Sequence, residues 1–225
     1  MKKREDVCVI VQARLGSQRV PKKMAKNFSG TTLLDIAIKK IKKCNSFSNN
    51  QFYASLWEKE LKDIAKKHKV NIFNRSETSA NSEGTPMSTM YEWWNKLPYK
   101  YCILVNACNP FLKKETIDSF FESYVNSEAV GMFAVVEKKN YFWNEQSSLL
   151  TPLTEDVMNT KTVNSTYEAA HCLYASKMSD IGRGVWMGNF NTPGEIELYP
   201  ISEFEALDID HQWQFDMCEK LWSAV

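Results

Sequence analysis

The sequence predicts an α/β protein with a doubly wound, mostly parallel β-sheet. Short runs of β-branched and aromatic residues recur along the first half of the chain, and stretches with helical spacing separate them. Strands that alternate with helices of this length are typical of βαβ units. Polar loops follow several of these strands. Because ligands bind such sheets at the carboxyl ends of the strands, these loops are candidates for a binding site.

The strands of the first half are expected at 7–12, 51–56, 70–73, 101–106 and 129–136. The helices between them are indicated by apolar residues at intervals of three and four, for example Leu33-Leu34-x-x-Ala37-Ile38-x-x-Ile41. The loops at 11–30, 75–85 and 106–114 then share one edge of the sheet. The segment "AAHCLYASKMSDIG" predicts a strand and then a helix, with His171 as a core histidine. A strand at 195–201 and a helix from 211 complete the pattern.

Residues 138–165 break this alternation. The segment "KKNYFWNEQSSLLTPLTEDVMNTKTVNS" is polar, aromatic and irregular, and neither the helical nor the strand period holds in it. We expect a single domain over 1–225 with an excursion at 138–165, either a small β subdomain or a dimerisation arm. Three consecutive aromatic residues, Tyr141-Phe142-Trp143, suit an acceptor pocket or a dimer contact.

The composition is that of a globular protein without a membrane span. No apolar run approaches the roughly 20 residues that a spanning helix needs, and the charged N-terminus lacks the apolar core of a signal peptide. The sequence therefore predicts a soluble, cytoplasmic protein. The six cysteines include no C-x-x-C pair, which favours reduced thiols with a packing role over a disulfide framework or a zinc site.

The charge is unevenly distributed along the chain. Residues 1–114 hold 22 Lys and Arg against 9 Asp and Glu, whereas residues 115–225 hold 6 against 18. The loop "VQARLGSQRVPKKMAKNFSG" concentrates basic residues directly after the first strand. Glycine and fixed cations suit a triphosphate, but the loop is neither a P-loop nor a G-x-G-x-x-G turn, so an ordinary basic loop stays open. The chain contains no nucleic-acid-binding motif, and we expect no nucleic-acid partner.

Asp208-Ile209-Asp210 is the candidate metal site. In an extended segment both carboxylates project to the same side, and Mg²⁺ prefers one or two carboxylates together with phosphate oxygens. Alternatively, Asp210 only caps the helix that follows it. A cationic phosphate loop and an acidic metal site are the two parts that nucleotidyl transfer needs.

Three segments together resemble the acylneuraminate cytidylyltransferases, the CMP-sialic acid synthetases. "VQARLGSQRVPKKMAKNFSGTTLLDIAI" is similar to the family's opening A-R-x-G-S-x-x-x-P-x-K-N, "LVNACNPFLKKETID" to its Q-P-T-S-P-L-R segment, and "EALDIDHQWQFDMCEKLW" to its closing L-D-I-D-x-x-x-D-F. The resemblance implies a Rossmann-like nucleotidyltransferase fold, with an excursion that often forms a homodimer.

The resemblance also implies roles for individual residues. Arg14, Lys23, Asp208 and Asp210 would be catalytic, with the two aspartates holding Mg²⁺. The residues that would bind the nucleotide are Gln12, Ala13, Arg14, Gly16, Ser17, Arg75 and Asn106. Lys138, Lys139 and Phe142 are the candidates for the acceptor. Departures from the family pattern occur at Met24, Trp57, Ser82, Leu112 and across Asn106-Ala107-Cys108-Asn109.

The expected reaction is transfer of CMP from CTP to a small anionic acceptor, a sialic-acid-like or other 2-keto-3-deoxy sugar acid, with release of pyrophosphate. Because several departures fall near the expected acceptor, a non-sugar acceptor such as a phosphonate and a non-catalytic nucleotide-binding module remain alternatives.

Overall fold

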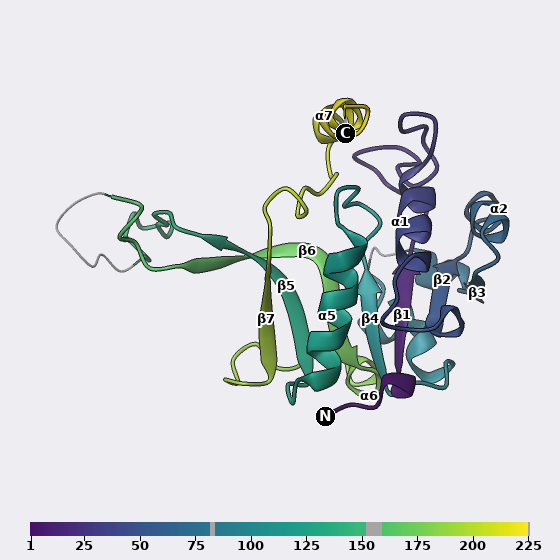
Figure 1. Cartoon of the computed structure of the whole chain (residues 1–225), viewed down its shortest axis with the longest axis horizontal. Helices are drawn as coiled ribbons and strands as arrows, with labels where there is room; N and C mark the ends of the chain where they lie inside the picture. Colours follow the sequence, from purple (N-terminus) through teal and green to yellow (C-terminus); the bar gives the residue numbers. More distant parts are fainter. Residues whose placement is uncertain (82–83, 152–158, 225) are drawn as a thin grey trace.

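A computed structural model describes residues 1–81, 84–151 and 159–224 of the chain. Its centre is a seven-stranded sheet in the order β3-β2-β1-β4-β6-β5-β7 (Figure 1). The strands are β1 (Val7–Gln12), β2 (Phe52–Leu56), β3 (Asn71–Asn74), β4 (Tyr101–Val105), β5 (Gly131–Lys138), β6 (Thr166–Lys177) and β7 (Ile196–Ile201). The predicted strands are therefore confirmed, with boundaries that shift by one or two residues.

The sheet is mostly parallel and has a topological switch point between β1 and β4. β2 and β4 both pair in parallel with β1, on opposite sides of it, and β3 pairs in parallel with β2. Only β6 runs antiparallel to its neighbours, β4 and β5. In open α/β sheets a switch point opens a crevice at the carboxyl ends of the strands, so the expected site lies after β1 and β4.

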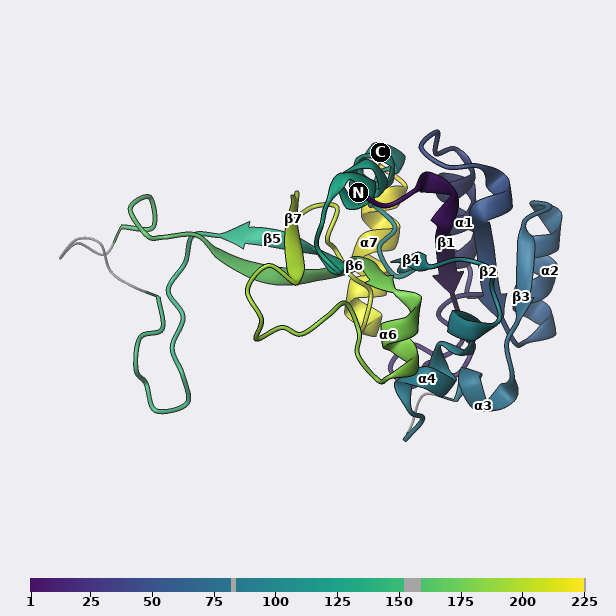
Figure 2. The ribbon, with the colours of Figure 1, turned by 90° about the horizontal axis from the view of Figure 1, so that it is seen from below.

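Helices cover both faces of the sheet, which confirms the doubly wound class. Figure 2 shows α1 and α5 on one face and α3, α4 and α6 on the other. The helices are α1 (Leu33–Lys42), α2 (Lys59–Lys67), α3 (Glu77–Ala80), α4 (Met87–Met90), α5 (Lys114–Asn126), α6 (Met178–Gly182) and α7 (Gln212–Trp222). Short 3₁₀ turns lie at Arg4–Asp6, Asn49–Gln51 and Glu92–Asn95.

Two apolar clusters fill the space between the sheet and these helices. The larger one joins β1, α1 and α5, and its fully buried side chains include Phe120 and Phe121. The smaller one lies on the opposite face around Trp93 and Ile181. Side chains alternate between the faces of a strand, so Val9 enters the first cluster and Ile10 the second. This packing fixes the strand ends that carry the site.

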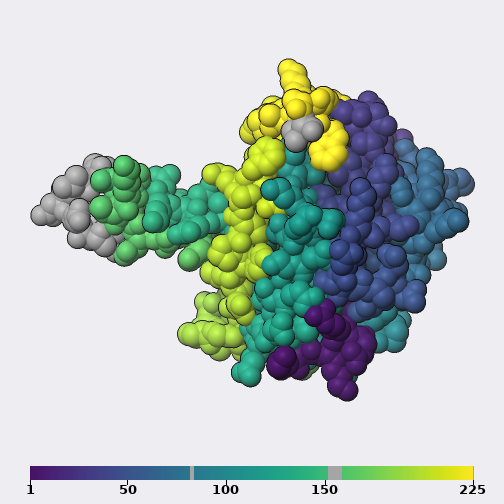
Figure 3. Space-filling model, in the orientation of Figure 1, coloured from purple at the N-terminus to yellow at the C-terminus, as the bar shows by residue number. Residues whose placement is uncertain are grey.

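The end of β5 beyond Val136 and the N-terminal part of β6 leave the sheet as a projecting arm. Met132 and Phe133 pair with Ala175 and Tyr174, but Val135 already pairs with Ala169, so β6 bulges in between. Beyond the sheet the two strands continue as a ribbon that extends from the body of the molecule (Figures 1 and 3). The expected excursion at 138–165 corresponds to the tip of this arm, of which 152–158 lie outside the described residues.

Two expectations drawn from composition concern the cysteines and membrane-spanning helices. All six cysteines are free, and four of them are buried. No helix among the described residues is long and apolar enough to cross a membrane. The helical spacing of Met87-x-x-Met90-Tyr91-x-x-Trp94 predicts one continuous helix, but α4 ends at Met90 and a 3₁₀ turn follows.

Candidate active site

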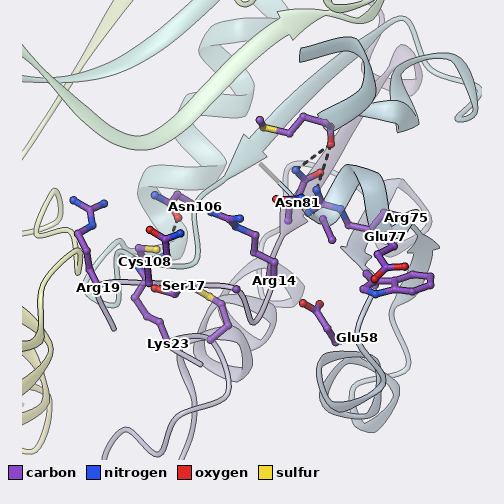
Figure 4. Close-up of a pocket in the computed structure, with 18 of the residues that line it drawn as sticks. Arg14, Ser17, Arg19, Lys23, Glu58, Arg75, Glu77, Asn81, Asn106 and Cys108 are labelled. Carbon is purple, nitrogen blue, oxygen red and sulfur yellow. Dashed lines mark hydrogen bonds between the residues drawn. The ribbon is translucent and has the colours of Figure 1, made fainter. Parts of the chain in front are cut away.

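A cavity of about 960 Å³ opens at the carboxyl ends of β1 to β4. Its wall is built by the loops that follow these four strands, together with the segment that precedes α7 (Figure 4). The lining residues are Gln12, Ala13, Arg14, Gly16, Ser17, Gln18, Arg19, Lys23, Met24, Trp57, Glu58, Arg75, Glu77, Ala80, Asn81, Met90, Asn106, Cys108 and Asp210. All seven residues predicted to bind the nucleotide are thus brought together, at the switch point of the sheet.

The loop after β1 is held by apolar anchors rather than by regular structure. Val20 is fully buried and Met24 is 6% exposed, and both belong to the larger core cluster. Backbone bonds from Ser17 to Leu15 and from Lys23 to Val20 fold the loop into tight turns. With its apolar residues turned inward, the loop presents Arg14, Arg19 and Lys23 to the cavity. Met24 replaces the family's asparagine in one of these anchoring positions.

Lys23 joins the basic loop to the acidic segment. Its side chain is largely buried, and its Nζ donates to the backbone carbonyl of Ile209 and lies 3.5 Å from Asp210 Oδ1. Arg19 forms an ion pair with the same oxygen of Asp210 at 2.8 Å. Two cations therefore neutralise Asp210, and the predicted catalytic residues Lys23 and Asp210 lie side by side although 187 positions separate them.

Arg14 supplies positive charge to the centre of the cavity. Within the described part of the chain its guanidinium has no ion-pair partner. Figure 4 shows it between two groups of side chains, with Ser17, Arg19 and Lys23 on one side and Glu58 and Arg75 on the other. A cation without an ion-pair partner among the described residues, in a cavity wide enough for a nucleotide, suits a phosphate group.

Asp208 is a largely buried carboxylate with one oxygen that the described residues leave unsatisfied. One of its oxygens, Oδ1, is buried and has no hydrogen-bond partner among the described residues. Burial raises the pKa of Asp208, and the negative charge of Asp210 raises it further. A buried carboxylate oxygen without a partner costs free energy, unless a cation or a donor reaches it. Two adjacent carboxylates of which one is unsatisfied fit a divalent cation whose other ligands are phosphate oxygens and water.

The turn after β4 holds the Asp208–Asp210 segment in place. The backbone N–H of Ile209 donates to the carbonyl of Cys108 at 3.1 Å. Asn109 is 2% exposed, and its Nδ2 donates to the carbonyls of Ala206 and Leu207 at 3.2 and 3.3 Å. This turn departs from the family's Q-P-T-S. The departure has a structural consequence, because Asn109 donates to the two backbone carbonyls that directly precede Asp208 in the chain.

Two predicted nucleotide-binding residues, Gln12 and Asn106, contact the cavity with groups that already have protein partners. The Gln12 side chain accepts from Trp93 Nε1 at 2.9 Å and from Ser55 Oγ at 3.2 Å. Asn106 donates from Nδ2 to the carbonyl of His171 at 2.9 Å and accepts from the backbone N–H of Cys108. These bonds shape the strand ends, and direct contact of Gln12 or Asn106 with a nucleotide stays a prediction.

Arg75 is buried, although the predicted contact with the nucleotide requires an accessible side chain. It is 3% exposed, its Nε donates to Ser79 Oγ at 3.0 Å, and one NH₂ group donates to the carbonyl of Ser79. Burial lowers the pKa of Arg75 to about 10, against the opposing effect of Glu58. Arg75 thus ties α3 to the end of β3, and its contact with a nucleotide also stays a prediction. Ser82, a departure in the loop that follows, lies outside the described residues.

The three predicted acceptor residues lie away from the cavity wall. Lys138 forms ion pairs with Glu168, at 3.3 Å, and with Glu203. Lys139 is exposed and Phe142 is 38% exposed, and both lie on the arm. The family resemblance and the aromatic segment 141–143 made them candidates for the acceptor, but β5 carries them out of the sheet. An acceptor role for them stays a prediction, and in this chain alone they do not meet the cavity.

His171 is not the core histidine that its apolar neighbours suggested. Its side chain is exposed, and it lies at φ +51° in the bulge of β6. Nδ1 is 3.3 Å from the hydroxyl of Tyr174, and a positive charge on the ring would lower the pKa of Asp208. The bulge interrupts the strict alternation of faces from which a buried position was inferred.

Two further departures can be placed. Leu112 is 2% exposed in the larger core cluster, so the family's arginine is replaced by an apolar packing residue. Trp57 lines the cavity with an exposed fraction of 41%. The residue that follows it, Glu58, also lines the cavity, and no motif in the sequence singled it out.

The whole chain is similar in fold to solved nucleotide-using enzymes. A CMP:2-keto-3-deoxy-manno-octonic acid synthetase complexed with CTP superimposes with a TM-score of 0.67 at 9% identity, over 97% of this chain and 98% of that one. A cytidylyltransferase from Leptospira borgpetersenii serovar Hardjo-bovis (strain JB197) gives 0.63 at 14% identity, over 98% of this chain and 87% of that one.

A third solved structure is a 4-diphosphocytidyl-2C-methyl-D-erythritol synthase from Anaerococcus prevotii DSM 20548, with a TM-score of 0.62 at 13% identity over 96% and 98% of the two chains. At these identities the likeness concerns the fold. A search of curated proteins finds no match to the sequence.

The sequence of the chain shows which family it belongs to. Residues 8–213 match the family described as Cytidylyltransferase. This range includes the basic loop after β1, the turn after β4 and both aspartates of the proposed metal site. The match is to the broad family, and the narrower resemblance to the acylneuraminate enzymes stays a prediction. The chain belongs to the cytidylyltransferase family of nucleotidyltransferase enzymes, which use CTP.

Proposed function

We propose that this enzyme transfers CMP from CTP, with Mg²⁺, to a hydroxyl of a sialic-acid-like or other 2-keto-3-deoxy sugar acid. The observation that carries the proposal is the meeting of the basic loop and the acidic segment in one cavity, where Lys23 contacts both Ile209 and Asp210. Cations for a triphosphate and carboxylates for a metal ion are the protein groups that nucleotidyl transfer uses.

In the proposed reaction an oxygen of the acceptor hydroxyl bonds to the α-phosphorus of CTP. The bond from that phosphorus to the oxygen bridging to the β-phosphate breaks, the hydroxyl proton is lost, and pyrophosphate leaves. Arg14 and Lys23 counter the negative charge that develops on the phosphates. Because this chemistry asks mainly for positioning and charge neutralisation, no protein nucleophile is required. Burial raises the pKa of the nearby Cys108 thiol to about 11, so this thiol stays neutral.

Asp208 and Asp210 are the residues that would hold Mg²⁺. The buried, unpartnered Oδ1 of Asp208 fits a metal ligand, and no group of three or more metal-binding side chains occurs among the described residues. Two protein carboxylates are sufficient when the remaining ligands are phosphate oxygens and water. A bound Mg²⁺ would supply charge neutralisation at the phosphates. Lys23 and Arg19 both pair with Oδ1 of Asp210, which fixes the position of this carboxylate.

The acceptor class rests on the resemblance of three motifs to the acylneuraminate enzymes. A structural neighbour named for a 2-keto-3-deoxy sugar acid supports the same class. Another neighbour is named for a methylerythritol product, which keeps a non-sugar-acid acceptor such as a phosphonate as the second candidate. The altered turn Asn106–Asn109 and the apolar Leu112 are the departures that favour this second candidate.

We also propose that the arm mediates a homodimer. Its described tip exposes apolar side chains that a monomer would leave in water, with exposed fractions of 53% for Trp143 and 61% for Leu150. A ribbon that projects from the body in this way can reach a second copy (Figure 3). In such a dimer, Lys139 and Phe142 would lie near the partner's cavity, which is the arrangement the family resemblance implies.

The direct test of the acceptor is product analysis. The enzyme is incubated with CTP, Mg²⁺ and, separately, sialic acid, other 2-keto-3-deoxy sugar acids and simple phosphonates. We expect a new CMP-linked sugar acid by mass spectrometry with one of the sugar acids. A CMP-linked phosphonate would replace the acceptor class, whereas product formation with neither class would contradict both candidates.

A further inference from the structure

Glu58 carries a carboxylate oxygen that the fold buries without satisfying it. Its Oε1 accepts a hydrogen bond from the backbone N–H of Leu15 at 2.7 Å, which ties the start of α2 to the loop after β1. Its Oε2 is buried and has no hydrogen-bond partner in the described part of the chain. Because the first oxygen is fixed by the backbone, the second has a defined position on the cavity wall.

This position lies at the end of the cavity opposite the metal site. Figure 4 shows the Glu58 carboxylate directed into the cavity, on the other side of Arg14 from Ser17, Arg19 and Lys23. Trp57, Ala80 and Met90 contribute apolar surface to the cavity wall. Phosphates belong at the cationic end, since an ionised carboxylate repels them. Arg75 lies on the same side of Arg14 as Glu58, but it is buried and its guanidinium donates to Ser79. The end with Glu58 and the apolar side chains is left for the nucleoside.

An unpartnered carboxylate oxygen accepts hydrogen bonds and donates none, so its ligand must be a donor. Cytosine presents an amino group at its 4-position, where uracil presents a carbonyl oxygen. A carboxylate that faces this position accepts from cytosine and repels uracil. We infer that Glu58 is a specificity-determining residue, whose Oε2 accepts a hydrogen bond from the 4-amino group of the CTP base. This inference rests on the proposed function, because it assumes that the cavity binds CTP.

The geometry makes Glu58→Gln a sharp test. The Leu15 N–H requires an acceptor at the Oε1 position, so the glutamine oxygen takes that place and its NH₂ group takes the place of Oε2. An acceptor is thereby exchanged for a donor without loss of the contact that holds the loop. The matched control is Glu60→Gln in the first turn of the same helix, whose carboxylate pairs with Lys22 at 3.5 Å and lies outside the cavity lining.

The measurement is calorimetric titration of the full chain with CTP, UTP and dCTP in the presence of Mg²⁺. We expect the wild type and Glu60→Gln to prefer CTP over UTP. Glu58→Gln should lose this preference by roughly 10- to 100-fold, through weaker CTP binding and stronger UTP binding. The ratio of CTP to dCTP affinities should stay unchanged, since the 2′-hydroxyl is not the proposed partner.

Other outcomes overturn the assignment in distinguishable ways. If Glu58→Gln weakens CTP and UTP equally, Glu58 supports Arg14 or the loop rather than the base. If only the CTP to dCTP ratio changes, its partner is the ribose. If the wild type binds none of the three nucleotides, the proposed function itself fails, and the base assignment fails with it.

Discussion

Lys23 is the residue on which the site depends most. Its ammonium group lies beneath the cavity, held by the carbonyl of Ile209 and by Asp210, and its side chain is 9% exposed. A lysine buried in this way is a fixed charge, and fixed charges stabilise a phosphoryl transition state without reorganisation. The adjacent Lys22 is not buried and does not contact the acidic segment. Its side chain is 67% exposed and pairs with Glu60.

The pair of lysines provides a matched prediction. Lys23→Ala should lower kcat by roughly 100-fold or more, because a charge close to the phosphates is lost. Lys22→Ala, at an adjacent position of the same loop, should change kcat less than about twofold, since exposed ion pairs contribute little. Steady-state kinetics with CTP and the identified acceptor measure both, with circular dichroism as the check on folding. Near-wild-type turnover of Lys23→Ala would contradict its assigned role.

Among single residues, the sequence predicted those that belong to motifs and missed those whose role depends on contacts formed in the folded protein. Arg14, Lys23 and Asp210 were identified because their spacing follows a family pattern, and the cavity brings them together. Glu58 could not be singled out, since its importance depends on one oxygen bound to Leu15 and one left unpaired. The exposure of His171 depends on a bulge in β6, and the alternation of apolar and polar residues in the sequence does not predict that bulge.

The start of α1 shows how one carboxylate joins two elements. Asp35 accepts from Thr31 Oγ1 at 2.7 Å, and its side chain contacts Lys39 at 2.7 Å and His68, at the end of α2, at 2.6 Å. Burial alone would raise the pKa of Asp35, but hydrogen bonds from Lys39, Thr31 and His68 lower it to about 2. The ionised form is therefore favoured in the folded protein.

This cluster predicts a pH-dependent contribution to stability. A lowered folded-state pKa stabilises the fold above the unfolded-state pKa of about 3.9, and this stabilisation is lost as the pH falls toward 2. Because solvent screens this partly exposed cluster, its size at pH 7 is at most about 2 kcal/mol. Asp35→Asn should reduce the free energy of unfolding by more at pH 7 than at pH 3, as measured by urea denaturation. Asp216→Asn, an exposed carboxylate on α7, is the control. Equal losses at both pH values would contradict the assignment.

Elements with a long, regular apolar pattern were predicted well, and those shaped by tertiary contacts were not. β1, α1 and α5 follow their periodicities because one stripe of each enters the same core. α4 ends at Met90, since the turn that follows places Trp93 in the second cluster, where its Nε1 donates to Gln12. The arm was recognised only as a break in pattern, because its strands bury little of their own surface.

The molecule as a whole consists of a compact body and an arm that exposes apolar side chains. The proposed homodimer predicts a mass in sedimentation equilibrium of twice the 26.0 kDa of one chain. Trp143→Glu should shift the equilibrium to monomer, because a charge replaces an apolar group at the proposed contact. Phe190→Glu, which alters a side chain 66% exposed away from the arm, should remain dimeric. A monomeric wild type, or a dimeric Trp143→Glu protein, would contradict the role of the arm.

The central claim is that this fold uses its switch-point cavity to release pyrophosphate from CTP. The most direct measurement is pyrophosphate release from CTP, UTP, ATP and GTP in turn, with Mg²⁺ and a mixture of 2-keto-3-deoxy sugar acids, for the wild type and Asp210→Asn. We predict release from CTP that depends on the sugar acids and falls by orders of magnitude in Asp210→Asn. Release from another nucleotide in preference to CTP, or undiminished release by Asp210→Asn, would contradict the account.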